Sequence, residues 1–404
     1  MSDPARVARI QAAVEEAGVS AWLLFDFHGT NPIARRVLGC DLDPHASKTT
    51  RRWFYLVPAA GDPVKLVHRL EPAALDHLPG RTRVYLTWQE LERSLADAIG
   101  ALGRAGQPVV AMEYSESARL PYVSRVDAGT VELVRAAGAR VATSADLAQR
   151  FDGVLDPAAR QDHRRTGGVL HGIMSAAFEH AGRCAKAGRP TTEMGLQRWI
   201  LERFEAEGLV SSDPPVVAVD VHSAEAHYVT SPARDLPIGA GCYLLLDAWA
   251  KAARSGAVYA DYTQVAFFGL SAPEPHRAAF AAVREARDAA IAHVRDAVRS
   301  GRAVRGCDVD DAARSVIRAR GLADRFFHRT GHSIGEEVHG NGVHLDNLET
   351  RDERRLLDGT LVSVEPGVYL EAFGVRSEVN LLVDGGTVAV TTEPIQEEIL
   401  LLGA

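Results

Sequence analysis

The sequence has few cysteines and no long apolar segment. Four cysteines are scattered over 404 residues without a C-x-x-C pair: Cys40, Cys184, Cys242 and Cys307. This spacing is typical of reduced, mainly structural thiols, so the sequence predicts a cytoplasmic protein. The chain starts with the pattern of an amphipathic helix rather than a signal peptide, and no later apolar run is long enough to span a bilayer. We therefore expect neither a secretion signal nor a membrane-spanning segment.

Positive charge is scarce relative to negative charge. Lysine and arginine number 45 against 53 aspartates and glutamates, which leaves a net charge of −8 with histidine neutral. Nucleic acids and anionic membranes attract basic protein surfaces. The charge balance therefore argues against either of them as a partner.

The length of the chain predicts two domains, because 404 residues exceed an ordinary single core. In the first part, β-like runs alternate with a helical pattern at 88–104. These runs, rich in branched and aromatic residues, cover 21–27, 51–58, 63–68 and 108–114. The segment "FDGVLDPAAR" then supplies Gly153 and Pro157 at a boundary. The pattern predicts an α/β domain over residues 1–155 and a second domain over 156–404.

The second part of the chain shows one coarse pattern twice. Two helices and then a β region are expected at 158–183, 191–207 and 215–269. Two further helices and a second β region follow at 274–300, 308–320 and 326–404. Helix, helix and strands in two successive halves predict an α+β domain whose two sheets pack together.

Histidines are concentrated in "HRTGHSIGEEVHGNGVH", residues 328–344, which holds four of the fifteen in the chain. His328 and His332 have the i, i+4 spacing of a helical metal motif, but the glutamate of H-E-x-x-H is missing. Four glycines in the segment also oppose a helix, since each costs about 1 kcal/mol relative to alanine. Taken alone, the segment is best interpreted as a loop whose histidines gather by chance.

Two aspartates in the first β region suggest a shared site. An apolar run ends at Asp247, a loop turns the chain, and the next run carries Asp261. An ionised aspartate in an apolar strand is costly unless it is paired, hydrogen-bonded or bound to metal. If the runs pair as a hairpin, both carboxylates face one pocket, and Thr263 shares a face with Asp261 as a supporting donor. One aspartate could simply end a strand, but two in one hairpin favour a site.

The last β region adds two glutamates. Glu365 ends an apolar run before a Pro-Gly turn, and Glu378 lies inside the next run. Alternation places Arg376 beside Glu378 on one face. A buried Arg376–Glu378 ion pair is the structural alternative, although it leaves Glu365 unexplained.

Together, two aspartates, two glutamates and a histidine offer oxygen and imidazole donors without thiolate. This set suits two hard-to-borderline divalent cations. Two such ions activate water and polarise a carbonyl. The clustered histidines then have a purpose, because one can be a ligand while others hydrogen-bond the substrate and the developing oxyanion.

The segment from about residue 158 to 404 resembles peptidase family M24, which has the pita-bread fold. With the preceding α/β domain, the architecture is similar to prolidase, Xaa-Pro aminopeptidase and creatinase. The resemblance implies five metal ligands, in "LLLDAWA", "YADYTQV", "TGHSIG", "SVEPGVY" and "VRSEVN": Asp247, Asp261, His332, Glu365 and Glu378. It also implies two further site histidines, His227 in "VDVHSAEAHYVTSP" and His339 in "EEVHGNG".

This resemblance implies a dinuclear metal-dependent exopeptidase or dipeptidase that hydrolyses short peptides, with Xaa-Pro bonds as candidates. Mn²⁺ or Co²⁺ is the expected metal, with Zn²⁺ as an alternative, and the expected assembly is a homodimer. Asp247 and Glu378 would bridge two ions, Asp261 would chelate one of them, and His332 and Glu365 the other. Glu365 is also assigned the proton that passes to the leaving nitrogen. Catalysis or substrate binding is assigned to His227, His339 and Arg376.

Several positions depart from the family pattern, among them Asp220, Gln264 and Gly340. None is a predicted ligand. Three further histidines are expected to have surface or packing roles, with the last as the strongest exception: His222, His328 and His344. Two other functions stay open, a metal-free creatinase-like C–N hydrolase and a non-catalytic pseudo-peptidase that binds without cleaving. Aminopeptidase, carboxypeptidase and dipeptidase activity are also left open.

Overall fold

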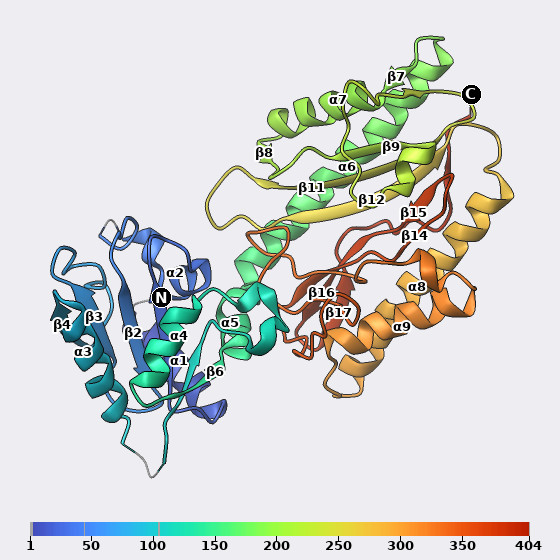
Figure 1. Cartoon of the computed structure of the whole chain (residues 1–404). Helices are drawn as coiled ribbons and strands as arrows, with labels where there is room; N and C mark the ends of the chain where they lie inside the picture. The colour runs from blue at the N-terminus through green and yellow to red at the C-terminus, as the bar shows by residue number, and fades with distance from the viewer. Residues whose placement is uncertain (1–2, 44, 104–105, 404) are drawn as a thin grey trace. The chain divides into compact units, whose positions relative to one another are not determined.

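The computed structural model describes residues 3–43, 45–103 and 106–403 (Figure 1). The chain divides into two compact units, Met1–Asp152 and Gly153–Ala404. Within the described ranges, no helix combines the length and the apolar character needed to cross a membrane.

The first unit is built on a six-stranded mixed sheet in the order β4-β3-β2-β1-β5-β6. Its strands are β1 (Ala21–Asp26), β2 (Trp53–Pro58), β3 (Val64–His68), β4 (Arg81–Tyr85), β5 (Val109–Met112) and β6 (Arg140–Thr143). The pairs β1–β2 and β2–β3 are antiparallel, and the other neighbours are parallel. The four β runs expected from the sequence are therefore confirmed as β1, β2, β3 and β5.

Helices cover both faces of this sheet. Along β1, Trp22 and Leu24 belong to one buried cluster and Leu23 and Phe25 to another, because successive side chains point to opposite faces. The first cluster involves α1 (Asp3–Glu16), α2 (Pro32–Leu38) and α5 (Ala145–Asp152). The second involves α3 (Trp88–Gly100) and α4 (Ala128–Ala136). A sheet buried on both faces explains why its central strands read as continuous apolar runs.

The second unit repeats two helices followed by strands, as expected. The four helices are α6 (Pro157–Lys186), α7 (Glu193–Ala206), α8 (Glu274–Arg299) and α9 (Gly306–Ala319). The first sheet contains β8 (Leu209–Val210), β9 (Val216–Val219), β11 (Tyr243–Ala252), β12 (Ala260–Phe267) and β18 (Leu400–Leu401). The second contains β13 (Leu361–Val364), β16 (Val379–Asp384) and β17 (Thr387–Val390), beside a small pair formed by β14 (Gly367–Tyr369) and β15 (Gly374–Arg376).

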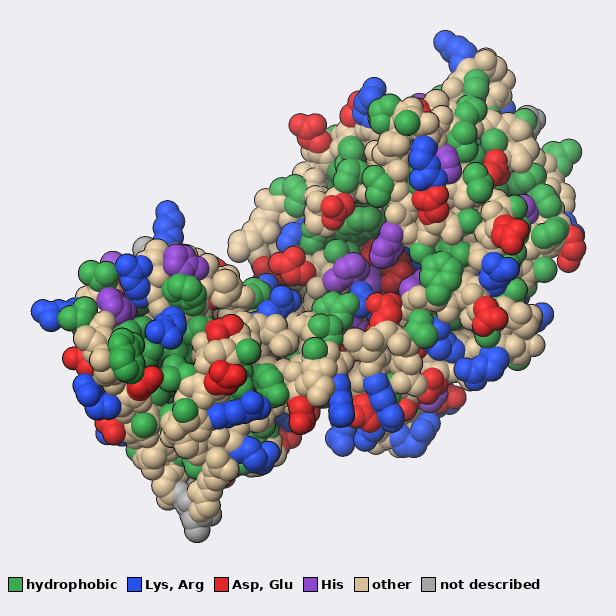
Figure 2. Space-filling view, viewed as in Figure 1, with side chains coloured by type: hydrophobic (Ala, Val, Ile, Leu, Met, Phe, Trp, Pro, Cys, Tyr) green, Lys and Arg blue, Asp and Glu red, His purple; other side chains and the backbone are tan. Residues whose placement is uncertain are grey.

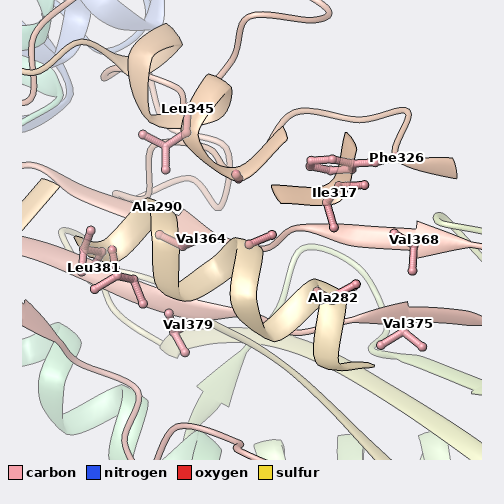
Figure 3. Packing of buried hydrophobic residues seen from close by; sticks show 14 of the residues in the cluster. Ala282, Ala290, Ile317, Phe326, Leu345, Val364, Val368, Val375, Val379 and Leu381 are labelled. Atoms are coloured by element: carbon pink, nitrogen blue, oxygen red, sulfur yellow. The ribbon is translucent and has the colours of Figure 1, made fainter. Parts of the chain in front are cut away.

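In each half of the second unit, a pair of helices packs on one face of the sheet and forms a core with it. Helices α6 and α7 pack on the β11–β12 face that carries Leu244, Leu246 and Tyr262. Helices α8 and α9 pack against β13 to β16, as Figure 3 shows for Ala290 and Val364. Strands β12 and β16 lie side by side where the two halves meet, and polar side chains join them there: the Asp261 N–H donates to Asn380 Oδ1, and the Thr263 hydroxyl contacts Glu378.

One expectation about this unit is wrong. The second β region was expected from residue 326, but the described strands begin only at β13, and residues 326–360 form loops with isolated bridges. Side chains satisfy much of this backbone. Asp310 accepts from the backbone N–H groups of Thr330 and Asn347, while Arg354 donates to the carbonyls of Asn341 and Gly342. Because these bonds replace a strand ladder, the histidine segment folds as an ordered loop.

Candidate metal centre

Strands β11 and β12 form the antiparallel hairpin expected from the sequence, with Asp247 and Asp261 on one face. In the ladder, Asp247 lies opposite Thr263 and Asp261 lies opposite Trp249. Residues that face each other in such a ladder project to the same side of the sheet. The Thr263 hydroxyl lies 2.9 Å from Asp247 Oδ1 and 2.8 Å from Glu378 Oε2. The expected support from Thr263 is therefore present.

The two glutamates come from the other half of the unit. Glu365 directly follows β13, and Glu378 directly precedes β16. Arg376, at the end of β15, forms an ion pair with Asp247, and its Nε lies 4.0 Å from Glu365 Oε2. Among the described residues, the Arg376–Glu378 ion pair that the sequence allowed is not formed. Arg376 instead joins the second half of the unit to the β11–β12 hairpin.

Close packing of the loop on β13 positions the backbone of His332. At Gly331, a Cβ atom would lie 2.0 Å from the Ser363 carbonyl oxygen, so a larger residue would push the loop away. The N–H of His332 then donates to Ser363 Oγ over 2.9 Å. The glycine beside this histidine therefore has a physical reason.

The imidazole of His332 faces the carboxylates through one nitrogen. Its Nδ1 lies 3.2 Å from the Ser333 carbonyl, an arrangement that places the ring proton on Nδ1. The Nε2 atom lies 3.5 Å from Asp261 Oδ2 and 3.4 Å from Glu365 Oε1. An unprotonated Nε2 directed at two carboxylates has the form expected of a metal ligand.

The predicted ligands thus converge in one buried cluster. Ligand atoms of Asp261, His332 and Glu378 all lie within 4.8 Å of one another. Each of these three side chains is buried, and Asp247 is 8% exposed. Within the part of the chain that the structure describes, Asp261 Oδ1 and Glu378 Oε1 have no hydrogen-bond partner. Buried carboxylate oxygens without a donor are costly, and a divalent cation is the partner that their chemistry fits.

Electrostatics of the cluster supports the same fit. Burial, followed by the neighbouring Asp247, raises the pKa of Asp261 well above its usual value. Burial and the charges of Asp261 and Glu365 likewise raise the pKa of Glu378. Burial lowers the pKa of His332, so this imidazole stays neutral. A cation held among these side chains would stabilise the ionised carboxylates and the neutral imidazole together.

Two other histidines stand at the edge of the cluster. The ring of His339 lies 4.4 Å from that of His332 and nearly perpendicular to it, and His339 is exposed. Desolvation by the surrounding protein lowers the pKa of His339. The nearby charge of His332, and then that of His227, act in the same direction. His227 is also exposed, on the segment that follows β9. Figure 2 shows histidine side chains gathered with acidic side chains in a hollow of this unit.

His328 has a packing role, as expected, and its ring also joins a hydrogen-bond network that leads to the cluster. Its Nδ1 lies 2.7 Å from the Arg329 carbonyl, and its Nε2 lies 2.9 Å from the Tyr369 hydroxyl. Tyr369 in turn accepts a hydrogen bond from Arg376 over 3.0 Å. The sequence signal for Tyr369 was only its place after the Pro-Gly turn that follows Glu365, which does not show where its hydroxyl points.

The remaining histidines and departures lie around the centre rather than in it. His222 is buried, with Nδ1 at 2.9 Å from Glu193 Oε1, and His344 is buried and accepts from the N–H of Ser333. Both therefore have the structural placement expected of them. Asp220 accepts from the N–H of Tyr243. Gln264 lies on the helix-covered face of β12, with Nε2 at 2.8 Å from the Tyr262 hydroxyl.

Comparison with known proteins identifies the family. The model of metallopeptidase family M24 matches residues 169–385, which is more than half of the chain. The chain belongs to metallopeptidase family M24. Its membership places it among peptide-bond hydrolases, and the resemblance recognised from five ligand motifs is confirmed.

Individual relatives agree with this membership. A probable dipeptidase PepE of Mycobacterium tuberculosis is 26% identical over 396 residues, which cover 96% of this chain and 94% of that protein. A putative Xaa-Pro aminopeptidase of Mycoplasma pneumoniae is 26% identical over 196 residues, or 48% of this chain and 51% of that protein. The chain thus matches about half of the Mycoplasma protein and nearly all of the Mycobacterium protein.

A solved structure shows the fold of the entire chain. The dipeptidase PepE from Mycobacterium ulcerans aligns over 100% of this chain and 98% of its own, with a TM-score of 0.72 at 23% identity. The expected architecture, an α/β N-terminal domain followed by an α+β pita-bread domain, is therefore confirmed as the fold.

Proposed function

We propose that this M24 chain is a metal-dependent peptidase that hydrolyses short peptides, dipeptides first among them. One observation carries the proposal: four carboxylates and one imidazole, drawn from both halves of the unit, converge in a buried cluster with two unpartnered carboxylate oxygens. Dipeptides are favoured because the relative that matches nearly the full chain is named a probable dipeptidase. Xaa-Pro bonds stay candidates, since the other relative is named for them.

Five side chains would hold two divalent ions, and the set fits Mn²⁺ or Co²⁺, with Zn²⁺ as the alternative: Asp247, Asp261, His332, Glu365 and Glu378. When bound, such ions supply Lewis acidity that activates water and polarises the scissile carbonyl. The Thr263 hydroxyl lies between the carboxylates of Asp247 and Glu378, so it would hold both of them in place for the ions. Positioning of Asp247 falls to Arg376, whose guanidinium contacts it directly.

Other side chains would act on the substrate itself. His339 and His227 are exposed beside the cluster, so they can donate hydrogen bonds to the developing oxyanion and to the leaving side of the substrate. Glu365 keeps 16% of its side chain exposed, which leaves it access to the proton that the leaving nitrogen must receive. Arg376 is 4% exposed and already bonded to Asp247, Tyr369 and the Ala226 carbonyl. We therefore propose a positioning role for Arg376 in place of direct substrate binding.

A peptide panel tests this function. The purified chain is assayed on dipeptides and tripeptides with free ends, on N-acetylated and C-amidated forms, and on Xaa-Pro sequences, before and after exhaustive chelation. A dipeptidase hydrolyses dipeptides with two free ends, loses activity on chelation, and regains it with Mn²⁺ or Co²⁺. Full activity after chelation would instead favour the metal-free C–N hydrolase, and binding without cleavage would favour the pseudo-peptidase.

Assembly and location stay predictions. We expect a homodimer, which light scattering at working concentration would show, and a cytoplasmic location, which fractionation of the source cells would show. Division into a creatinase-type N-terminal domain over 1–155 and a catalytic domain over 156–404 is proposed in the same way. Separate expression of residues 156–404 would show whether that part folds alone.

A further inference from the structure

Trp249 is an aromatic side chain beside the metal centre that the proposed mechanism does not use. It lies on β11, two residues after Asp247 and directly opposite Asp261 in the ladder. Side chains two apart on a strand share a face, and cross-strand partners have Cβ atoms about 5 Å apart. The indole therefore stands on the same face as both carboxylates and next to each of them. It is half-buried, so part of the ring remains accessible.

The orientation of this indole is fixed by its surroundings. Its Nε1–H donates to Ser212 Oγ over 3.1 Å, which ties the polar edge of the ring to the loop after β8. The ring packs at the margin of a small apolar cluster that includes Ile334 and Val338, from the segment between His332 and His339. Trp249 thus forms a wall between the hairpin and the histidine loop.

The end of the hairpin is held firmly, so the wall is pre-formed. The N–H of Val258 donates to Asp162 Oδ2 over 3.3 Å, and the N–H of Tyr259 donates to the Gly335 carbonyl over 2.9 Å. On the same face, the Lys251 ammonium bonds the Glu336 carbonyl and lies 4.9 Å from the Tyr259 ring centre. The neighbour of the indole away from the metal ligands is therefore a cation.

We propose that Trp249 determines substrate specificity by binding an apolar side chain of the peptide. That side chain belongs to the substrate residue that lies over Asp247 and Asp261. This inference rests on the proposed peptidase function. A scissile carbonyl that reaches the carboxylate cluster must bring an adjacent residue within contact of this ring. An indole face suits aliphatic, aromatic or prolyl side chains. A lysine or arginine side chain is disfavoured there, because the Lys251 ammonium lies next along the face.

Selectivity measurements on paired dipeptides test the proposal. The full chain and its Trp249→Ala and Trp249→Phe variants are assayed on Leu-Gly, Gly-Leu, Phe-Gly, Gly-Phe, Lys-Gly, Gly-Lys and Gly-Gly. In one of the two positions, Trp249→Ala should lower kcat/KM for Leu and Phe about tenfold relative to Gly, the scale on which hydrophobic pockets separate side chains. Trp249→Phe should retain most of the preference, since it keeps an aromatic face, and Lys should gain relative to Leu in Trp249→Ala.

Trp199 provides the matched control. It is also a half-buried tryptophan of the second unit, but it lies on α7, stacked at 4.9 Å on His180. Trp199→Ala should leave the ratio of Leu to Gly substrates unchanged. Bound metal should be equal in the wild type and in both Trp249 variants, which separates a specificity role from damage to the centre.

Intrinsic fluorescence gives a second readout that does not need turnover. Addition of an uncleaved apolar ligand, such as a Leu-Leu analogue with a reduced peptide bond, should change the emission of the wild type and of Trp199→Phe but not that of Trp249→Phe. The proposal is overturned if Trp249→Ala slows all seven dipeptides equally, or if the fluorescence change survives in Trp249→Phe. Failure of the wild type to cleave any peptide would instead contradict the proposed function.

Discussion

The Tyr369 hydroxyl donates a hydrogen bond to Nε2 of His328 over 2.9 Å. The direction of this bond follows from the other ring nitrogen, because Nδ1 lies 2.7 Å from the Arg329 carbonyl and must carry the proton there. Burial lowers the pKa of His328 to about 3, so the ring stays neutral. Tyr369 is then left to accept from Arg376, which itself pairs with Asp247. A continuous chain of bonds therefore runs from His328 to a predicted metal ligand.

Removal of the Tyr369 hydroxyl should loosen that ligand. Tyr369→Phe leaves Nε2 of His328 and one N–H of Arg376 without their partner, while the ring packing is kept. We expect metal affinity to fall roughly tenfold, at the lower end of the effect seen when a supporting bond to a ligand is removed. Metal titration of apo-protein measures this. Unchanged metal affinity together with unchanged kcat would contradict the proposed role of the chain of bonds.

The Thr263 hydroxyl should matter more, because it touches two predicted ligands. Thr263→Val keeps the shape of the side chain but removes the group between Asp247 and Glu378. Metal affinity should fall by roughly 10–100-fold, with secondary structure retained. Thr130→Val is a suitable control, since Thr130 is also buried but lies in the first unit, where its hydroxyl bonds Asp127 over 2.7 Å. An equal loss of metal affinity in both variants would count against a local effect.

Much of the centre could be predicted because each carboxylate interrupts or ends an apolar run. Asp247, Asp261, Glu365 and Glu378 are costly where they stand, and this cost is visible without a structure. The shared face of Asp247 and Asp261 was predictable once their two runs were paired as a hairpin, since alternation along each strand decides which side chains share a face. Pairing across the two halves was not predictable. The bond from Arg376 to Asp247 spans elements whose approach depends on the packing of the entire unit.

The loop that carries the histidines shows a second limit of prediction from the sequence. Its residues were expected to include strands from 326 onward, but their backbone groups bond to Asp310 and Arg354, which lie outside the segment or at its far end. A local pattern does not reveal such long-range partners. Strand β4 was missed for another reason, because most of its residues are exposed and the sequence "RTRVY" carries little apolar signal.

The pH dependence of stability should show the burial of His163. This histidine is fully buried, with Nδ1 at 2.8 Å from the Tyr259 carbonyl, and burial lowers its pKa to about 4. In the unfolded chain the pKa is about 6.5, so between these values only the unfolded chain takes up the proton. The stabilisation is complete above pH 6.5 and declines as the pH falls towards 4, by roughly 3 kcal/mol at 1.36 kcal/mol per pKa unit.

Denaturant unfolding at several pH values tests this, with His163→Gln as the variant. The loss of unfolding free energy between pH 7 and pH 4 should be smaller in His163→Gln than in the wild type. Replacement of the exposed His45 by glutamine serves as control and should leave the slope unchanged. If the unfolding free energy of His163→Gln depends on pH as steeply as that of the wild type, the proton uptake arises at another group.

Loss of His339 should separate catalysis from metal binding. The ring lies beside His332 but is exposed and outside the ligand set, so His339→Ala should retain bound metal. Its kcat should fall by roughly 10²–10³, the effect of losing one donor to a developing oxyanion. Metal content and kcat are measured on the same preparation. If His339→Ala loses metal as readily as a ligand variant does, His339 is itself a metal ligand.

The most direct test of the centre is the amount of metal bound per chain, measured by equilibrium dialysis with Mn²⁺ and elemental analysis. The wild type should bind about two ions, as expected for two aspartates, two glutamates and one histidine without thiolate. His332→Ala should lose at least one of them, because Nε2 faces both Asp261 and Glu365 and no other described imidazole replaces it there. Two ions in the wild type and fewer in His332→Ala would support the account. No tight binding in the wild type, or the same content in His332→Ala, would contradict it.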